Sequence, residues 1–237
     1  MSQLDPRLSK AVTAHSSVVA TLNVIHSIRT RGLRRTLLFA TLGSGIPILG
    51  ELLAIHALKV IRHYVQPQFS GVPLAIALGW YNVGYGTLAM VNGAFNDGDK
   101  PRATKSLAPT VALAATSFDL LLDPIGLDLS LWEWSEGGPY APEIKGPNGK
   151  RGIPLLNFAG WIALTSGVTL AYQYVWTRDA TTDAPGSQDG GGSDAERAAA
   201  LLLLSYYLPA AVWALKRDRR KYLLYSVPFA TILWATL

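Results

Sequence analysis

The strongest constraint on this chain is a series of apolar segments of about 20 residues, the length that crosses the hydrocarbon core of a bilayer. The clearest of them cover residues 36–58, 72–95, 106–122, 152–176, 198–215 and 222–237. Apart from closed barrels, only helices satisfy every backbone polar group within lipid. We therefore expect an all-α fold, a polytopic integral membrane helical bundle.

The first apolar stretch, residues 11–28, is interrupted by histidine, serine and asparagine. It is expected to be either a seventh span or an interfacial helix, so the sequence predicts six or seven transmembrane helices. They form a single membrane domain over residues 1–237. Residues 177–197 have almost no apolar content and predict a flexible polar linker between two helices.

Charge supports a membrane location. Charged residues are 16% of the chain, against roughly 25% in a soluble domain, and the net charge of +5 comes from Lys and Arg beside apolar segments. This arrangement is typical of loops flanking membrane helices and argues against nucleic-acid binding. We expect the cytoplasmic membrane. The basic run at 216–221 favours a cytoplasmic position for the N-terminal face, and the basic cluster at 29–35 favours the opposite orientation.

Two classes of chemistry are excluded or disfavoured by residue content. The chain has no cysteine, which excludes disulfides, thiolate chemistry and iron–sulfur ligation. Its four histidines show no spacing suited to shared metal ligation, so we expect no metal.

Several polar residues fall at a similar depth below one face of the predicted bundle. Counting from the helix ends places Glu51 about 10 Å inside, Asp119 about one turn inside, and Asp123 at the rim. Asn82 and Asn157 lie ten and five residues inside their own helices. Because a charge at membrane depth costs at least a few kcal/mol, such residues predict a functional pocket. The alternative is that they only join helices by hydrogen bonds. Asp123 also precedes Pro124 and suits a helix end.

Aromatic residues accompany these polar groups. The residues concerned are Trp80, Trp132, Trp134, Tyr140 and Trp161. Trp and Tyr are typical of the belt at a membrane interface, and they could equally form a pocket wall that stabilises a cation through the ring faces.

Two blocks of sequence carry a family resemblance. LDP at 122–124, WEW at 132–134, the Gly and Tyr at 138 and 140, and IPLLNFAGW at 153–161 resemble the signature of small membrane proteins of carotenoid biosynthesis that act as ψ-end hydratases. This 1,2-hydratase type includes bisanhydrobacterioruberin hydratase-like proteins. The block at 50–80 is similar to a second family block through Glu51, Tyr64, Gly71, Val72, Pro73 and Trp80. The resemblance covers residues 45–175.

The resemblance implies a carotenoid hydratase that adds water across the terminal C=C of an acyclic end group, giving a tertiary alcohol without a cofactor. Asp119 or Glu51 would donate the proton, and Asp123 would orient or deprotonate water. Asn82 and Asn157 would position that water. The cation would face Trp132, Trp134 or Tyr140. Tyr64, Trp80 and Trp161 complete the expected substrate-binding set, and the carotenoid would enter from the membrane lipid.

Two departures from the family pattern support an alternative. The chain has LLAIHALKVIRH between Glu51 and Tyr64, and an insert at 141–152. A non-catalytic carotenoid- or lipid-binding membrane scaffold, or a subunit of a larger pigment complex, would tolerate such changes.

Overall fold

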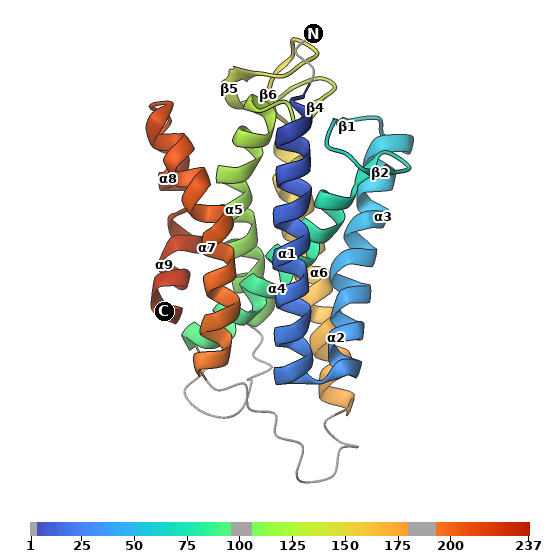
Figure 1. Ribbon diagram of the computed structural model, residues 1–237, viewed down its shortest axis with the longest axis vertical. Helices are drawn as coiled ribbons and strands as arrows, with labels where there is room; N and C mark the ends of the chain where they lie inside the picture. Colours follow the sequence, from blue (N-terminus) through green and yellow to red (C-terminus); the bar gives the residue numbers. More distant parts are fainter. Residues whose placement is uncertain (1–3, 96–105, 180–192) are drawn as a thin grey trace.

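The computed structural model describes residues 4–95, 106–179 and 193–237. Long helices run alongside one another (Figure 1), which confirms the all-α membrane helical bundle. The helical segments are α1 (Pro6–Arg31), α2 (Leu33–Ala40), η1 (Thr41–Gly45), α3 (Ile46–Leu52), η2 (Leu53–Ala57), α4 (Leu74–Phe95), α5 (Leu107–Asp128), α6 (Leu155–Asp179), α7 (Ser193–Lys216), α8 (Lys221–Tyr225) and α9 (Val227–Thr236).

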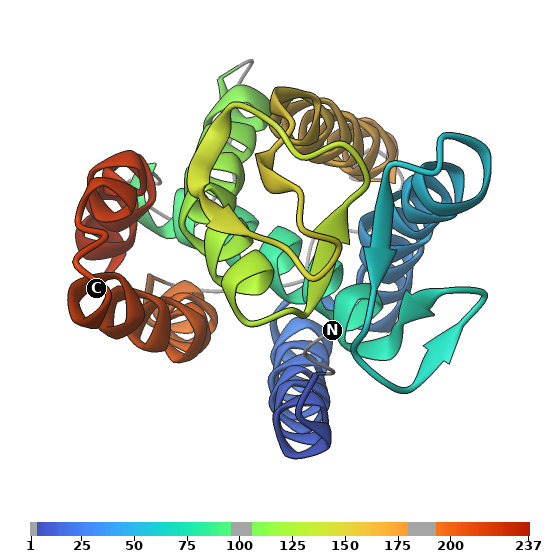
Figure 2. The ribbon, with the colours of Figure 1, turned by 90° about the horizontal axis from the view of Figure 1, so that it is seen from above.

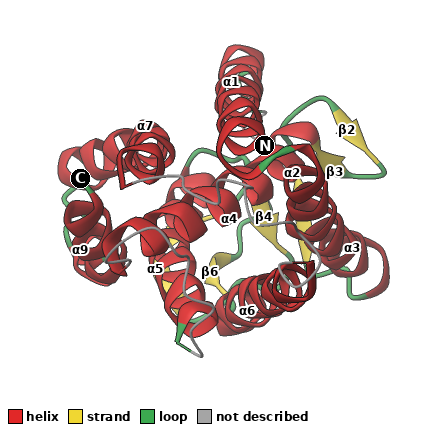
Figure 3. Cartoon of the chain, turned by 90° about the horizontal axis from the view of Figure 1, so that it is seen from below, coloured by secondary structure: helices red, strands yellow, loops and turns green. Residues whose placement is uncertain are grey.

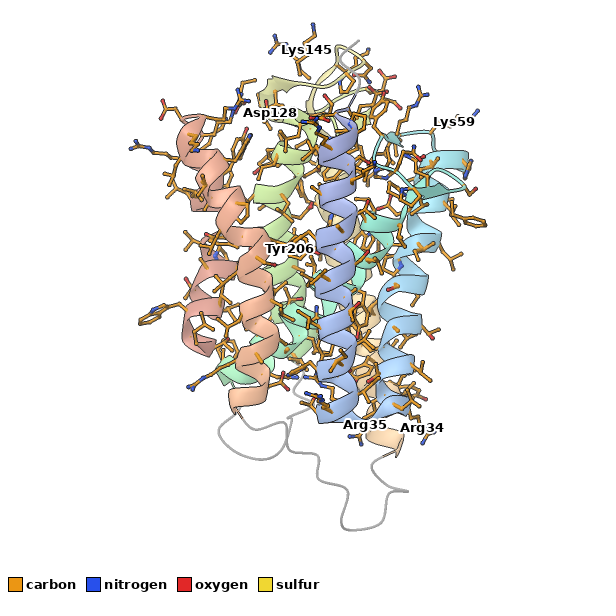
Figure 4. All side chains as sticks on the ribbon, in the orientation of Figure 1. Arg34, Arg35, Lys59, Asp128, Lys145 and Tyr206 are labelled. Carbon is orange, nitrogen blue, oxygen red and sulfur yellow. The ribbon has the colours of Figure 1, made fainter. Side chains whose placement is uncertain are left out.

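Five helical segments of the described chain are long and apolar enough to cross a membrane. They are Leu33–Ala57, Leu74–Phe95, Leu107–Asp128, Leu155–Val175 and Glu196–Lys216. The first runs continuously through α2, the π-helical turn η1, α3 and the π-helical turn η2. Charged side chains lie at the two ends of this bundle, with Arg34 and Arg35 at one end and Lys59, Asp128 and Lys145 at the other (Figure 4).

The expected final span, 222–237, is instead two short helices, α8 and α9. Pro228 stands in the first turn of α9, and a proline inside a continuous helix would remove a hydrogen bond and clash with the preceding turn. The backbone N–H of Phe229 donates to Ser117 Oγ of α5 at 3.0 Å. The break is therefore compensated by a bond to a neighbouring helix.

Helix α1 is long but too polar to count among the five spans. Its buried face carries Ser16, Asn23 and Ser27. Asn23 Nδ2 donates to Asn82 Oδ1 of α4 at 3.3 Å, and Asn82 Nδ2 donates to the Ser16 carbonyl at 3.0 Å and to the Tyr206 hydroxyl of α7 at 2.8 Å. Ser16, Asn23 and Ser27 thus face protein, which explains how a polar helix lies along the bundle.

Helix α4 lies near the centre of the bundle, with α1, α5, α7 and α9 against it (Figure 3). Almost every residue from Trp80 to Asn92 is buried, as expected for a helix covered on all sides. The core beside it includes Phe118, which stacks on Phe229 at 4.5 Å between ring centroids.

Three short antiparallel strand pairs cover the end of the bundle that carries the N-terminus (Figure 2). The pairs are β1 (Ile61–His63) with β4 (Trp132–Trp134), β2 (Gln68–Phe69) with β3 (Val72–Pro73), and β5 (Tyr140–Lys145) with β6 (Arg151–Ile153). The sequence predicted only connecting loops here. The insert at 141–152 supplies most of the β5–β6 hairpin.

The hairpin is fastened to α8 through Glu143. Its carboxylate lies 2.8 Å from Lys221 Nζ and 3.1 Å from Arg219, and it accepts the Tyr222 hydroxyl at 2.5 Å. Burial opposes ionisation of this carboxyl, but the bonds from Lys221 and Tyr222 outweigh it and lower the pKa of Glu143 to about 2. This charged cluster therefore holds the cap against the C-terminal helices at neutral pH.

The predicted linker is only partly described. Residues 177–179 extend α6 and 193–197 begin α7, so these parts are helical. Residues 180–192 lie outside the described residues.

Candidate active site

The site is centred on the last turns of α5, which extend beyond the predicted end at residue 122. Asp119 and Asp123 are four residues apart on this helix and are 6% and 2% exposed. Residues four apart lie on the same helix face, so both carboxyl groups point the same way. Asp123 was expected at the rim of a helix ending near Leu122, but the helix continues to Asp128 with Pro124 inside it.

The helix continues past Pro124 because another group replaces the missing donor. Proline at this position cannot donate to the carbonyl four residues earlier, that of Leu120. The Tyr140 hydroxyl of β5 donates to that carbonyl at 2.5 Å. Tyr140, predicted as a pocket wall, therefore supports the α5 backbone beside the two acids. Burial of the Tyr140 hydroxyl, and to a smaller extent the neighbouring Tyr222, raise the pKa of Tyr140.

Asn157 joins the two acids. Its amide Nδ2 donates to Asp119 Oδ2 at 3.0 Å and to Asp123 Oδ2 at 2.7 Å. Pro154 precedes α6 and Asn157 lies in its first turn, which brings the amide to the level of the last turns of α5. One side chain from a second helix thus holds both carboxyl groups together.

Trp132 contacts the other carboxyl oxygen of Asp123. Its indole Nε1 donates to Asp123 Oδ1 at 2.5 Å. The ring lies against Gly126, where any Cβ would overlap it. Trp134 on the same strand is buried, and its indole N–H makes no hydrogen bond of normal geometry in the described chain.

Glu51 of α3 is the third acid of the site. Oε1 accepts from Trp80 Nε1 at 3.0 Å, and Oε2 lies 3.0 Å from His63 Nε2. Trp80 stacks on Trp161 at 3.9 Å between ring centroids. Coulombic interaction links Glu51 with both Asp119 and Asp123, so α3, α4, α5 and α6 bring three carboxyl groups and the stacked Trp80 and Trp161 to one end of the bundle.

His63 completes the arrangement and was missed by sequence reasoning, which tested histidines only as metal ligands. It lies on β1 directly opposite Trp132 on β4, and the two rings meet edge to face at 6.2 Å. No helical spacing links Glu51 to a residue 12 positions later. The β1–β4 pairing sets His63 beside Trp132, and that pairing is not readable from local sequence. Gly126 was also missed, although its position three residues after Asp123 on the same helix face was an available signal.

Two predicted residues lie apart from the acids. The Asn82 side chain makes hydrogen bonds with Asn23, Ser16 and Tyr206, and these bonds join α1, α4 and α7. Figure 4 shows Tyr206 midway along the bundle. Tyr64 lies on the surface of the cap beneath the Arg62 guanidinium, 5.6 Å from its ring centroid. Burial, and to a smaller extent the interaction with Glu133, raise the pKa of Tyr64 to about 12.

The cluster therefore combines buried acids, an amide bridge, indole N–H donors and one imidazole. Within residues 4–95, 106–179 and 193–237 no group of three or more His, Asp or Glu side chains is arranged to hold a metal ion. The arrangement is suited to moving protons beside aromatic faces.

Comparison with known families identifies the chain. A family model described as carotenoid biosynthesis protein matches residues 12–217. No curated protein and no solved structure matches. The matched region contains every residue of the site described above, from Glu51 to Trp161. The chain belongs to the carotenoid biosynthesis protein family.

Proposed function

We propose that this protein is a carotenoid hydratase that adds water to the terminal trisubstituted C=C of an acyclic end group by acid catalysis, yielding a tertiary alcohol. The observation that carries the proposal is the Asn157 amide shared by two buried carboxyl groups, Asp119 and Asp123. Hydration of an isolated alkene needs a strong, positioned proton donor and no electron transfer, so no cofactor is required.

Asp119 is the proton donor in this proposal. In the described chain Asp119 accepts one hydrogen bond, whereas Asp123 and Glu51 each accept two. Two adjacent buried carboxylates repel one another, so the pair is more stable with one of the two protonated. Asp119 has the less occupied carboxyl group and can deliver that proton to the less substituted alkene carbon.

The tertiary carbocation that follows needs stabilisation and a nucleophile. Indole faces attract cations by about 2 kcal/mol when desolvated. Trp132 and Trp80 contact the acids, and Trp161 stacks on Trp80. Asp123, held by Trp132 and Asn157, orients the water. The acyclic chain enters from the lipid of the cell membrane and leaves only its reacting end at the polar cluster.

The experiment is expression in hosts that make lycopene or γ-carotene, with a search for products heavier by one water molecule. Asp119→Asn is expected to abolish the product while the protein stays folded in the membrane, and Glu51→Gln to reduce it strongly. The matched control is Asp128→Asn, because Asp128 lies on the same helix and also accepts an indole N–H, that of Trp213 at 3.0 Å. It should leave hydration intact.

The rival function would give a different result. If several acyclic carotenoids yield no hydrated product and unmodified pigment co-purifies at fixed stoichiometry, the protein is a binding scaffold. Full activity in Asp119→Asn would exclude the proposed acid.

A further inference from the structure

His63 is a buried histidine whose two ring nitrogens have different surroundings. Its side chain is 2% exposed. Nε2 lies 3.0 Å from Glu51 Oε2, whereas Nδ1 is buried with no hydrogen-bond partner in the described part of the chain. A buried polar atom without a partner costs about 1–3 kcal/mol. A small polar molecule bound at Nδ1 would remove that cost.

Glu51 decides which nitrogen carries the proton. Its Oε1 accepts from the Trp80 indole N–H, which can only donate. Both oxygens of Glu51 therefore face nitrogen atoms, as suits an ionised carboxylate that only accepts. Nε2 of His63 must then hold the hydrogen, and in the neutral ring Nδ1 is left as an acceptor. A carboxylate that fixes a histidine tautomer is the arrangement that prepares an imidazole as a general base.

Trp132 connects His63 to the acids of α5. The ring meets Trp132 edge to face, and the Trp132 indole N–H reaches Asp123. The β1–β4 register sets His63 opposite Trp132. Trp132 therefore lies between two groups of contacting side chains. The first group is Trp80, Glu51 and His63. The second group is Asp119, Asn157 and Asp123.

We propose that His63 Nδ1 binds the attacking water and takes its proton, with Glu51 as the positioning residue that fixes the tautomer. This inference rests on the hydratase function proposed above and assigns its second step. The Asp119 O–H bond breaks and its proton forms a C–H bond at the alkene carbon. Water oxygen then bonds to the tertiary cation as one water O–H bond breaks and its proton passes to Nδ1. That proton returns to Asp119 through solvent, so the balance is one water added.

Deuterium oxide separates the two steps in the purified protein reconstituted with an acyclic carotenoid. Asp119 can still deuterate the alkene carbon when His63 is replaced, and the cation then reverts by losing a proton. His63→Gln is therefore expected to lower alcohol formation by about 10²-fold or more while deuterium still enters recovered alkene. Asp119→Asn should lose both signals. His56→Gln is the matched control, because His56 is exposed and bonds only Ser70 in the described chain.

The outcomes are distinguishable. Alcohol formation by His63→Gln within about threefold of the parent, less than about 1 kcal/mol, would overturn the role of His63. Loss of exchange and hydration together in His63→Gln, with thermal unfolding unchanged, would also overturn it, because His63 would then serve the acid step. A parent protein that gives neither alcohol nor deuterium exchange refutes the hydratase itself, and the base with it.

Discussion

Replacement of Asn157 by leucine tests the amide bridge most directly. Leucine has a similar volume but no N–H, so Asp119 Oδ2 and Asp123 Oδ2 lose donors at 3.0 and 2.7 Å. A hydrogen bond to the ionised Asp123 contributes about 1.5–3 kcal/mol and one to the protonated Asp119 about 0.5–1.5 kcal/mol, so the two together contribute about 2–4.5 kcal/mol to holding the acids in place. Since each 1.36 kcal/mol is about a factor of ten in rate, even the lower figure corresponds to about a 30-fold loss of turnover.

The assay compares Asn157→Leu with Asn82→Leu in lipid nanodiscs. Asn82 is a buried asparagine whose hydrogen bonds join α1, α4 and α7 away from the acids, so its replacement should lower the unfolding temperature and preserve turnover per folded molecule. Hydrated carotenoid is measured by mass spectrometry, and folding by tryptophan fluorescence on heating. The reasoning is wrong if Asn157→Leu keeps turnover within about threefold of the parent, or if Asn82→Leu alone abolishes it.

Three further predictions concern packing, a buried ion pair and pH. Gly126→Ala should push the Trp132 ring away from Asp123 and lower turnover by about tenfold. Gly160→Ala, whose Cβ would meet nothing within 4 Å, should leave turnover unchanged. Equal activities of the two variants would contradict a role for the packing of Trp132 on Gly126. Arg31→Met removes the guanidinium that lies 2.6 Å from Glu196, and should lower the free energy of unfolding by about 3–5 kcal/mol. Adding Glu196→Leu should recover much of that loss. An unchanged unfolding temperature in Arg31→Met would contradict this prediction. The pKa of Glu143 is lowered from 4.5 to about 2, so its contribution is complete above about pH 4.5 and is lost as the pH falls toward 2. The effect is small because the carboxylate is partly exposed. The rate of limited proteolysis of α8 should depend less on pH in Glu143→Gln than in the parent. Identical pH profiles of the two proteins would contradict a role of Glu143 in holding α8.

Hydropathy and helix length were sufficient for the broad architecture. Lipid admits few backbone solutions, so apolar segments at 36–58, 72–95, 106–122, 152–176 and 198–215 predicted helices that the structure contains. The final segment differs because Pro228 interrupts it. The polar stretch 11–28 could not be assigned from hydropathy, since its Ser16 and Asn23 contact α4 and α7.

The acids were predictable for a related reason. Position along a helix fixes depth at a constant rise per residue, and carboxyl groups at membrane depth are costly enough to stand out. Depth alone placed Glu51, Asp119, Asp123, Asn82 and Asn157 near one face of the bundle.

The partners of those residues depended on the tertiary structure. Depth gives no information about rotation around a helix axis, so it could not distinguish Asn157, which bridges the acids, from Asn82, which faces α1. Nor could local sequence show that Tyr140 replaces the donor missing at Pro124. The position of His63 beside Trp132 arises from pairing between strands about 70 residues apart in the chain, a non-local choice that no short sequence pattern encodes. Composition and spacing determined a membrane bundle with acids near one end, and helix rotation together with strand pairing decided which of its polar groups form the site.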